Sequence, residues 1–138
     1  MKIERITSID QVLACVPFEQ EIRNKGRDRN SISTMLLGIR EMLPNPLFGF
    51  WIAYDKNKIV GYLNVMASPA KPLKRLIVLR IYAPDKKVQE KFNDIIVEFG
   101  KENKIKPGVM VTEVFKHDRA LERMGWKKVS TIMEKRLY

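Results

Sequence analysis

The most constraining feature of the sequence is an apolar run that passes through a proline into an amphipathic segment. Residues 76–82, LIVLRIY, are rich in β-branched and aromatic side chains, which predicts a buried central strand. Pro84 ends the strand, because proline has no N–H to donate to a sheet. Apolar residues then recur at helical spacing from Val88 to Phe99, which predicts a helix that packs on the sheet and ends between residues 100 and 103.

The junction between this strand and this helix has a chemical consequence. The first N–H groups of a helix have no partner inside the helix, and the helix dipole makes that end attractive to anions. If the protein binds a phosphorylated ligand, the turn at residues 83–85 is therefore the expected place.

The remaining segments alternate between strand and helix signals. They predict, in order, a strand at 2–6, a helix at 8–16 that Pro17 stops or bends, a polar connector or weak helix at 19–30, a helix at 31–43, strands at 50–54 and 59–66 around a hairpin loop at 55–58, the strand and helix described above, a strand at 109–115, a short helix at 118–124 and a strand at 128–138. Gly61 inside a strand predicts a bulge or a close approach of two backbones. Gly125 stands where a left-handed residue commonly ends a helix.

This order of elements, β-α-α-β-β-β-α-β-α-β, predicts the fold class. We expect an α/β protein with a mixed, mostly antiparallel central sheet and helices on both faces. A chain of 138 residues suits a single domain, here residues 1–138.

Composition excludes several classes of protein. An apolar fraction of 45% with 30% charged residues is ordinary for globular chains. No apolar run approaches the roughly 20 residues of a membrane span, and the first residues, MKIER, lack the apolar core of a signal peptide. The single cysteine, Cys15, permits no internal disulfide, so we expect a cytoplasmic protein. Cys15 is either a catalytic thiol or, as is more common, a small buried side chain.

The net charge of +10 is unevenly distributed along the chain. Lys and Arg outnumber Asp and Glu by nine to seven in residues 1–70 and by seventeen to nine in residues 71–138. Such a bias either serves solubility or attracts a polyphosphate cofactor, an acidic protein or nucleic acid. Nucleic acid is the less favoured partner, because acids are interspersed and no aromatic-plus-basic RNA-reading motif is present. Neither a membrane partner nor a metal site is expected.

Two stretches, together with the element order, resemble the GNAT superfamily of acyl-CoA N-acyltransferases. Residues 50–62, FWIAYDKNKIVGY, are similar to that family's hairpin of a strand, an acidic turn and I-V-G. Residues 120–126, ALERMGW, are similar to its C-terminal element of a helix, a Gly-aromatic pair and a last strand. The resemblance covers nearly the whole chain in element order. It implies an N-acetyltransferase that uses acetyl-CoA and an amine acceptor, which is a small molecule or a protein.

The resemblance also implies where acetyl-CoA binds. The family's loop reads Arg/Gln-x-x-Gly-x-Gly/Ala, and its small residues let backbone amides close around the pyrophosphate. In this sequence Lys87 falls at the basic position, while Glu90 and Phe92 fall where the family has small residues. The implied cofactor-binding residues are Ile81, Ala83, Lys86, Lys87, Val88, Gln89 and Lys91.

The catalytic groups that the resemblance implies come from two strands and a turn. The family generally needs a base for the acceptor amine and often a tyrosine acid for the leaving thiolate. Leu121 occupies the usual tyrosine position, which leaves Tyr82 at the end of the central strand as the candidate hydroxyl. Glu113 is the candidate base, and His117, with an ordinary pKa of about 6.5, is expected near the thiol of the cofactor. The alternatives are simple packing for Tyr82 and a surface turn for His117.

Two functions follow from these patterns. The first is an acyltransferase whose acceptor is bound by residues 19–30 and the hairpin. The second is a catalytically inactive GNAT-like binding or assembly module with a basic surface, which the bulky residues in the phosphate loop favour. An exposed last strand and the aromatic residues at 48–51 permit either a monomer or a homodimer.

Overall fold

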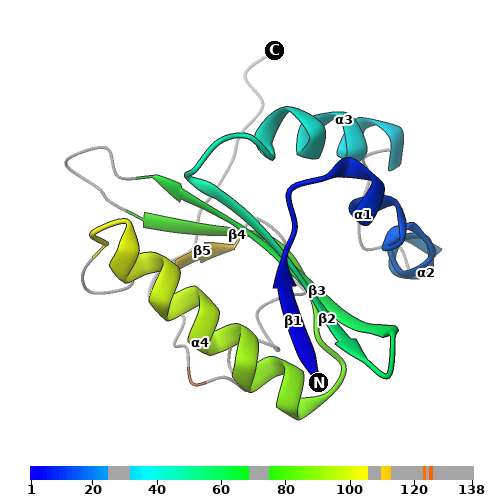
Figure 1. Cartoon of the computed structure of the whole chain (residues 1–138). Coiled ribbons are helices and arrows are strands. Elements are labelled where there is room, and N and C mark those ends of the chain that lie inside the picture. Colours follow the sequence, from blue (N-terminus) through cyan, green and yellow to red (C-terminus); the bar gives the residue numbers. More distant parts are fainter. Residues whose placement is uncertain (25–31, 69–74, 106–109, 113–122, 124, 126–138) are drawn as a thin grey trace.

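The computed structural model describes residues 1–24, 32–68, 75–105, 110–112, 123 and 125. Its elements are β1 (Lys2–Arg5), α1 (Ile9–Leu13), α2 (Val16–Asn24), α3 (Ile32–Met42), β2 (Phe48–Asp55), β3 (Lys58–Ser68), β4 (Arg75–Tyr82), α4 (Lys86–Glu102) and β5 (Met110–Thr112) (Figure 1). Of the strand expected at 109–115, the described residues form β5. The strand expected at 128–138, and the helix expected at 118–124 apart from residue 123, lie outside the described ranges. Gly125 itself has a φ of +91°, in the left-handed region expected for it.

Of the two interpretations of residues 19–30, a connector or a weak helix, helix α2 confirms the second as far as Asn24, and residues 25–30 lie outside the described ranges. A helix begins at Val16 and continues to Asn24, so the described residues between the first two strands form three helices, where the predicted element order contained two. Pro17 is the second residue of α2, and a proline is tolerated there because its missing N–H would have no partner in the first turn. The preceding helix has already ended at Leu13. Pro17 therefore marks the beginning of a helix rather than the end of one.

The described strands form one sheet in the order β1-β2-β3-β4-β5. Neighbouring strands from β1 to β4 are antiparallel, and β5 is parallel to β4. This confirms the mixed, mostly antiparallel sheet. The hairpin between β2 and β3 turns at Lys56 and Asn57, whose φ values of 50° and 65° are both left-handed. Two left-handed residues are typical of the tight turn that matches the twist of the flanking strands.

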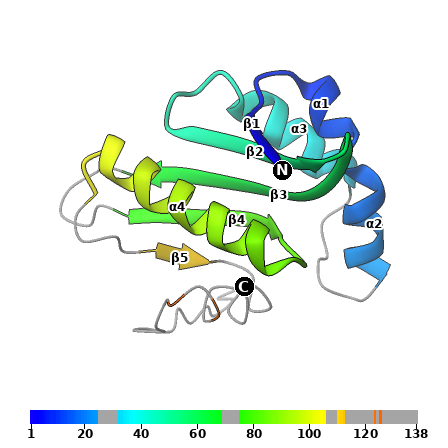
Figure 2. The same cartoon turned by 60° about the horizontal axis from the view of Figure 1, so that its bottom comes forward.

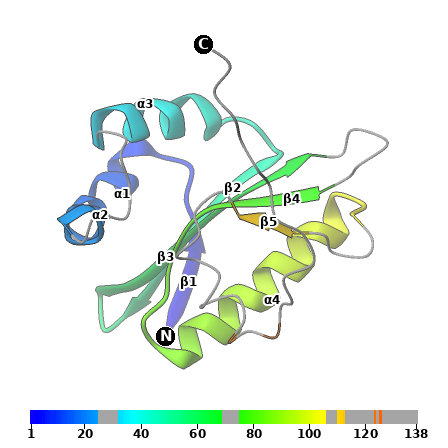
Figure 3. The ribbon, with the colours of Figure 1, turned by 180° about the vertical axis from the view of Figure 1, so that it is seen from behind.

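Helices cover both faces of the sheet, as the sequence predicted. Figures 1 and 2 show that, among the described helices, α4 lies across one face and α1, α2 and α3 are grouped against the other. The view from behind in Figure 3 shows the same separation. On the first face Phe92 and Ile96 of α4 belong to one core cluster with Leu63 of β3. On the second face Val12 and Ile39 belong to a cluster with residues of β2 and β3.

The pairing of β3 with β4 shifts by one residue in the C-terminal half of β4. Asn64 pairs with Arg80, whereas the next residue of β3, Val65, pairs with Val78, so β4 contains one extra residue. Such a bulge changes which face the following side chains occupy. In β4, Val78 and Ile81 pack in the core under α4, whereas Leu79 and Tyr82 pack on the side of α1–α3.

Gly61 lies at a second irregularity and at a close contact. The β2–β3 register shifts beside it. A Cβ at this position would lie 2.6 Å from the carbonyl oxygen of Tyr82 and 2.7 Å from Cγ1 of Val88. Both features expected from the sequence, the bulge and the close approach, are confirmed. The absence of a side chain therefore lets β3 lie directly against the end of β4 and the start of α4.

The variant Gly61→Ala is expected to lower the free energy of unfolding by about 3 kcal/mol, because backbone and core atoms must move to admit the methyl group. Urea denaturation measures the change. Gly38→Ala is the matched control, since a Cβ at this exposed position in α3 meets nothing within 4 Å. The control is expected to stabilise the protein by about 1 kcal/mol, the difference in helix propensity. Equal stability of the two variants would contradict the close approach at Gly61.

Candidate functional site

Side-chain hydrogen bonds hold the turn between β4 and α4 at both of its ends. Asp85 caps α4, and its Oδ1 accepts a hydrogen bond of 2.7 Å from the backbone N–H of Lys87. Within the first turns of α4, the buried side chain of Gln89 donates a 2.8 Å hydrogen bond to the carbonyl oxygen of Ala83. The strand end and the helix start are therefore held in one fixed relation.

The predicted cofactor-binding residues divide into two groups at this turn. Lys86, Lys87 and Lys91 are exposed on the first turns of α4. In contrast, Ile81 and Val88 belong to the buried core under α4. The side chain of Gln89 is committed to the turn, and Ala83 packs against the same core.

The two bulky residues of the expected phosphate loop do not share one environment. Phe92 is 0% exposed and packs in the core under α4, whereas Glu90 is exposed to solvent. The three exposed lysines fit an anionic group by charge. The carboxylate of Asp85 works against such a group, because it already accepts from an N–H at the start of the helix. The residues present thus fit a diphosphate through the positive charge of the three lysines more than through free backbone N–H groups.

Tyr82 lies on the opposite face of the sheet from α4 and is only half buried. Its ring centroid is 5.2 Å from that of Phe18 in α2 and 5.5 Å from that of Tyr62 in β3. Burial, and secondarily the charge of Glu21, raises the pKa of the Tyr82 hydroxyl above its ordinary value of 10.0. The hydroxyl therefore keeps its proton at neutral pH, as a general acid must.

Beside Tyr82 lies a buried charged cluster that the sequence pattern did not indicate. The side chain of Glu19 in α2 is 2% exposed; its Oε1 accepts a hydrogen bond from the hydroxyl of Tyr62. Its Oε2 lies 3.7 Å from Nε of Arg80 in β4. The one available signal was Arg80 itself, because a charged residue inside an apolar strand requires a buried partner.

The Tyr62 hydroxyl serves as a permanent donor in this cluster. Burial raises the pKa of Tyr62 far above its ordinary value, and the neighbouring carboxylate of Glu19 adds to the shift. Both causes disfavour a phenolate, so the hydroxyl retains the proton that it donates to Glu19.

Cys15 has the surroundings of a packing residue. It is 2% exposed, and burial, followed by the charge of Glu19, raises its pKa from 9.0 to about 12. The thiolate is the reactive form of cysteine. At neutral pH the Cys15 side chain is a neutral thiol, which supports the buried role expected from the sequence over that of a catalytic nucleophile.

We expect the Cys15 thiol to react with a disulfide reagent at pH 8 at least about 100-fold more slowly in the folded protein than in urea. Absorbance of the released thiolate measures the single thiol directly. The raised pKa also lowers stability as the pH rises from 9.0 toward about 12, since the unfolded thiol ionises first. Equal reaction rates in the two conditions would contradict the burial of Cys15.

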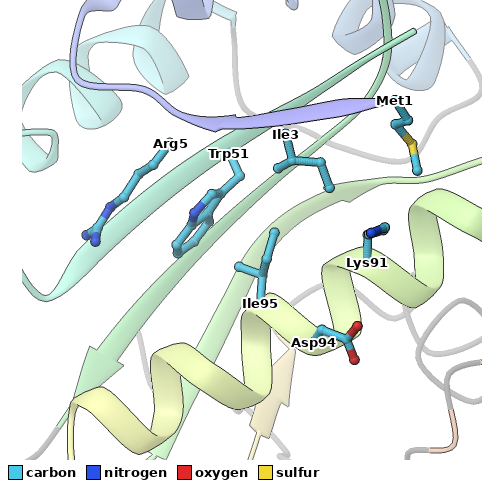
Figure 4. A pocket seen from close by; sticks show the side chains of 7 residues that line it. All are labelled: Met1, Ile3, Arg5, Trp51, Lys91, Asp94 and Ile95. Atoms are coloured by element: carbon cyan, nitrogen blue, oxygen red, sulfur yellow. The ribbon is translucent and has the colours of Figure 1, made fainter.

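A surface groove of about 480 Å³ lies between β1 and α4 (Figure 4), and Tyr82 is not one of its lining residues. Its lining residues are Met1, Ile3, Arg5, Trp51, Lys91, Asp94 and Ile95. The guanidinium of Arg5 lies 5.3 Å from the Trp51 ring centroid and 5.4 Å from that of Phe99, and it donates to the carbonyl oxygen of Phe48. Arg5 is thus held by two ring contacts and a hydrogen bond. Of the predicted site residues that the structure describes, Lys91 is the one that lines the groove.

Several predicted residues fall outside the part of the chain that the structure describes. Glu113 and His117 are among them, as are residues 25–30 of the expected acceptor region. Within the described residues, no helix has both the length and the apolar character to cross a bilayer. The described Cys, Asp and Glu residues also form no group of three able to hold a metal ion.

The sheet, its covering helices and the strand–helix junction together define the fold of the GNAT acetyltransferases. A predicted acetyltransferase from Clostridium acetobutylicum, whose crystal structure is described with acetyl-CoA, superposes with a TM-score of 0.77 at 14% identity. The similarity covers 99% of this chain and 96% of that protein. This confirms the fold that the resemblance implied.

Two further solved structures share the fold. A ribosomal-protein-alanine N-acetyltransferase from Brucella melitensis biovar Abortus 2308 has a TM-score of 0.70 at 14% identity, over 99% of this chain and 98% of the other. An aminoglycoside 6'-N-acetyltransferase from Acinetobacter haemolyticus has a TM-score of 0.67 at 14% identity, over 100% and 99%. No family model and no curated protein matches the sequence.

Proposed function

We propose that this protein transfers an acetyl group from acetyl-CoA to an amine acceptor. The observation that carries the proposal is the cluster of exposed lysines at the first turns of α4, directly after β4, within an acetyltransferase fold. Lys86, Lys87 and Lys91 bind the diphosphate of acetyl-CoA through charge. Ile81, Ala83, Val88 and Gln89 contribute backbone groups and the fixed shape of the turn.

The chemistry of the proposed reaction requires few protein groups. Bound acetyl-CoA supplies a thioester that a neutral amine attacks. Tyr82 keeps its proton because burial raises its pKa, which suits it to protonate the leaving thiolate. Glu113 and His117 are the proposed groups that take the proton of the amine.

The acceptor is an amine on a small molecule or on a protein. The similar enzymes named above are an aminoglycoside acetyltransferase and a ribosomal-protein-alanine acetyltransferase, so both kinds of acceptor occur on this fold. We place the acceptor on the α2 side of Tyr82, because Phe18 contacts Tyr82 there. The proposed setting is the cytoplasm, where acetyl-CoA and amines meet.

Acetyl-CoA is expected to stabilise the protein, by about 2.7 kcal/mol when it is present at 100 times its Kd. Calorimetric titration supplies the Kd. Lys87→Glu is expected to abolish detectable binding, because it places a negative charge at the proposed diphosphate site. Lys101→Glu is the matched control: it makes the same charge change at the opposite end of α4 and should leave the Kd unchanged within about twofold. Equal effects of the two variants would place the cofactor elsewhere.

A second candidate function is a GNAT-like binding module without acyl transfer. The specific observation in its favour is the capping carboxylate of Asp85, which accepts from the Lys87 N–H at the expected anion site. No stabilisation by acetyl-CoA at millimolar concentration would favour this module over the enzyme.

Asp85→Asn separates the two candidates further. Asparagine caps helices as well as aspartate, so α4 keeps its start while a negative charge is removed. If the diphosphate binds at this turn, its affinity should rise at least about fourfold, the Coulomb effect of a single pair of unit charges about 5 Å apart in water. Glu98→Gln, an exposed carboxylate farther along α4, is the control and should change the Kd little. Titration of both variants with acetyl-CoA checks this, and an unchanged Kd in Asp85→Asn would contradict the placement.

A further inference from the structure

Among the described residues, Glu19 is the one buried carboxylate, and the proposed reaction does not use it. It lies in α2, whereas its partners Tyr62 and Arg80 lie in β3 and β4. Desolvation of a carboxylate costs several kcal/mol unless partners compensate it. Its burial against the sheet therefore calls for an explanation beyond the packing of α2.

Arg80 connects Glu19 to an irregular point of the sheet. Its Nε faces Glu19, and its Nη1 donates a 3.0 Å hydrogen bond to the carbonyl oxygen of Leu79. Leu79 is the extra residue of β4, where the pairing with β3 shifts. One guanidinium thus contacts both α2 and the bulge. We call this set of contacts, from Glu19 through Arg80 to the Leu79 carbonyl, the Glu19–Arg80 link.

The bulge determines where the end of β4 presents its side chains. Val78 packs under α4, so strict alternation would also direct Arg80 and Tyr82 toward α4. Because of the extra residue, the side chains after Leu79 lie on the faces opposite to those that strict alternation would give them. Arg80 instead reaches Glu19, Tyr82 packs with Phe18 on the α2 side, and Ile81 packs under α4.

We propose that Glu19 and Arg80 are positioning residues for acetyl transfer: their link holds the bulge of β4, and the bulge places Tyr82 and Ala83 at the reaction site. This inference rests on the proposed function. An apolar pair of similar volume would attach α2 to the sheet as well or better, because a buried ion pair adds little net stability. In contrast, the guanidinium of Arg80 pairs with Glu19 and also donates to the Leu79 carbonyl, which an apolar side chain cannot do.

The experiment separates the effect of the Glu19–Arg80 link on the stability of the protein from its effect on the position of the end of β4. In the triple variant Glu19→Leu, Tyr62→Phe, Arg80→Met, the polar groups of the cluster are removed together, which leaves no isolated buried charge or hydroxyl. We expect its urea midpoint to equal or exceed that of the unaltered protein. Hydrogen exchange at the amides of residues 79–83 should nevertheless become at least about tenfold faster, while exchange at Ile96 and Phe99 in α4 stays unchanged.

Two further variants keep the result interpretable. Arg80→Lys retains the charge but not the forked donor, so it should also speed exchange at residues 79–83 if the link acts through geometry. Glu41→Gln, which alters an exposed carboxylate of α3 on the same face of the sheet, is the matched control and should leave exchange unchanged. If the triple variant does not fold, Arg80→Lys alone decides, and unchanged exchange in it overturns the proposal.

Acetyl-CoA titration connects the link to function. The triple variant should bind acetyl-CoA at least about fivefold more weakly than the unaltered protein, because Ile81 and Ala83 contribute to the proposed site. Unchanged exchange together with unchanged affinity would overturn the proposal. If the unaltered protein does not bind acetyl-CoA at all, the proposed function fails, while the exchange comparison still tests the link on its own terms.

Discussion

The extra residue at Leu79 is the constraint on which the described arrangement around the strand–helix junction depends. Because the side chains of β4 change faces there, this one strand contributes to both core clusters. Ile81 packs under α4, and Tyr82 packs under α2. A regular strand would exchange these two side chains. The aromatic contact of Tyr82 with Phe18 and the burial of Glu19 both follow from this one local departure from pleated geometry.

Beyond the bulge, the turn into α4 leaves the chain little freedom. Gly61 allows β3 to touch the Tyr82 carbonyl, and Gln89 binds the carbonyl of the next residue, Ala83. Asp85 then fixes the first turn of the helix. A rigid junction suits the site proposed for acetyl-CoA, because less conformational entropy is lost on binding when the protein is already ordered.

Most of the sheet and α4 were predictable from the sequence, since their signals are local. The apolar run before Pro84, the periodic stripe from Val88 to Phe99 and the glycine at position 61 each carry a physical meaning within a few residues. The beginning of helix α2 was not predicted, because Pro17 was taken to stop or bend the preceding helix, and the polar residues after it left a connector and a weak helix as alternatives. The lysines of α4 that the resemblance implied as cofactor-binding are exposed at the start of the helix, and their role stays a prediction.

The charged cluster was not predictable in the same way. Glu19 and Arg80 are far apart in the sequence, and a residue pattern carries no information on which distant charges meet. The bulge presents a similar difficulty: residues 76–82 are apolar on both faces, so no alternation of polar and apolar residues reveals that one face has changed to the other. The roles assigned to Glu113 and His117 remain predictions.

The strand β1 has a consequence for the behaviour of the protein at high concentration. It forms one edge of the described sheet, it spans only Lys2–Arg5, and three of its four residues are charged. Short, charged edge strands are poor templates for intermolecular sheet pairing, since a second strand would have to desolvate those groups. This side of the molecule therefore resists the edge-to-edge association through which open sheets aggregate.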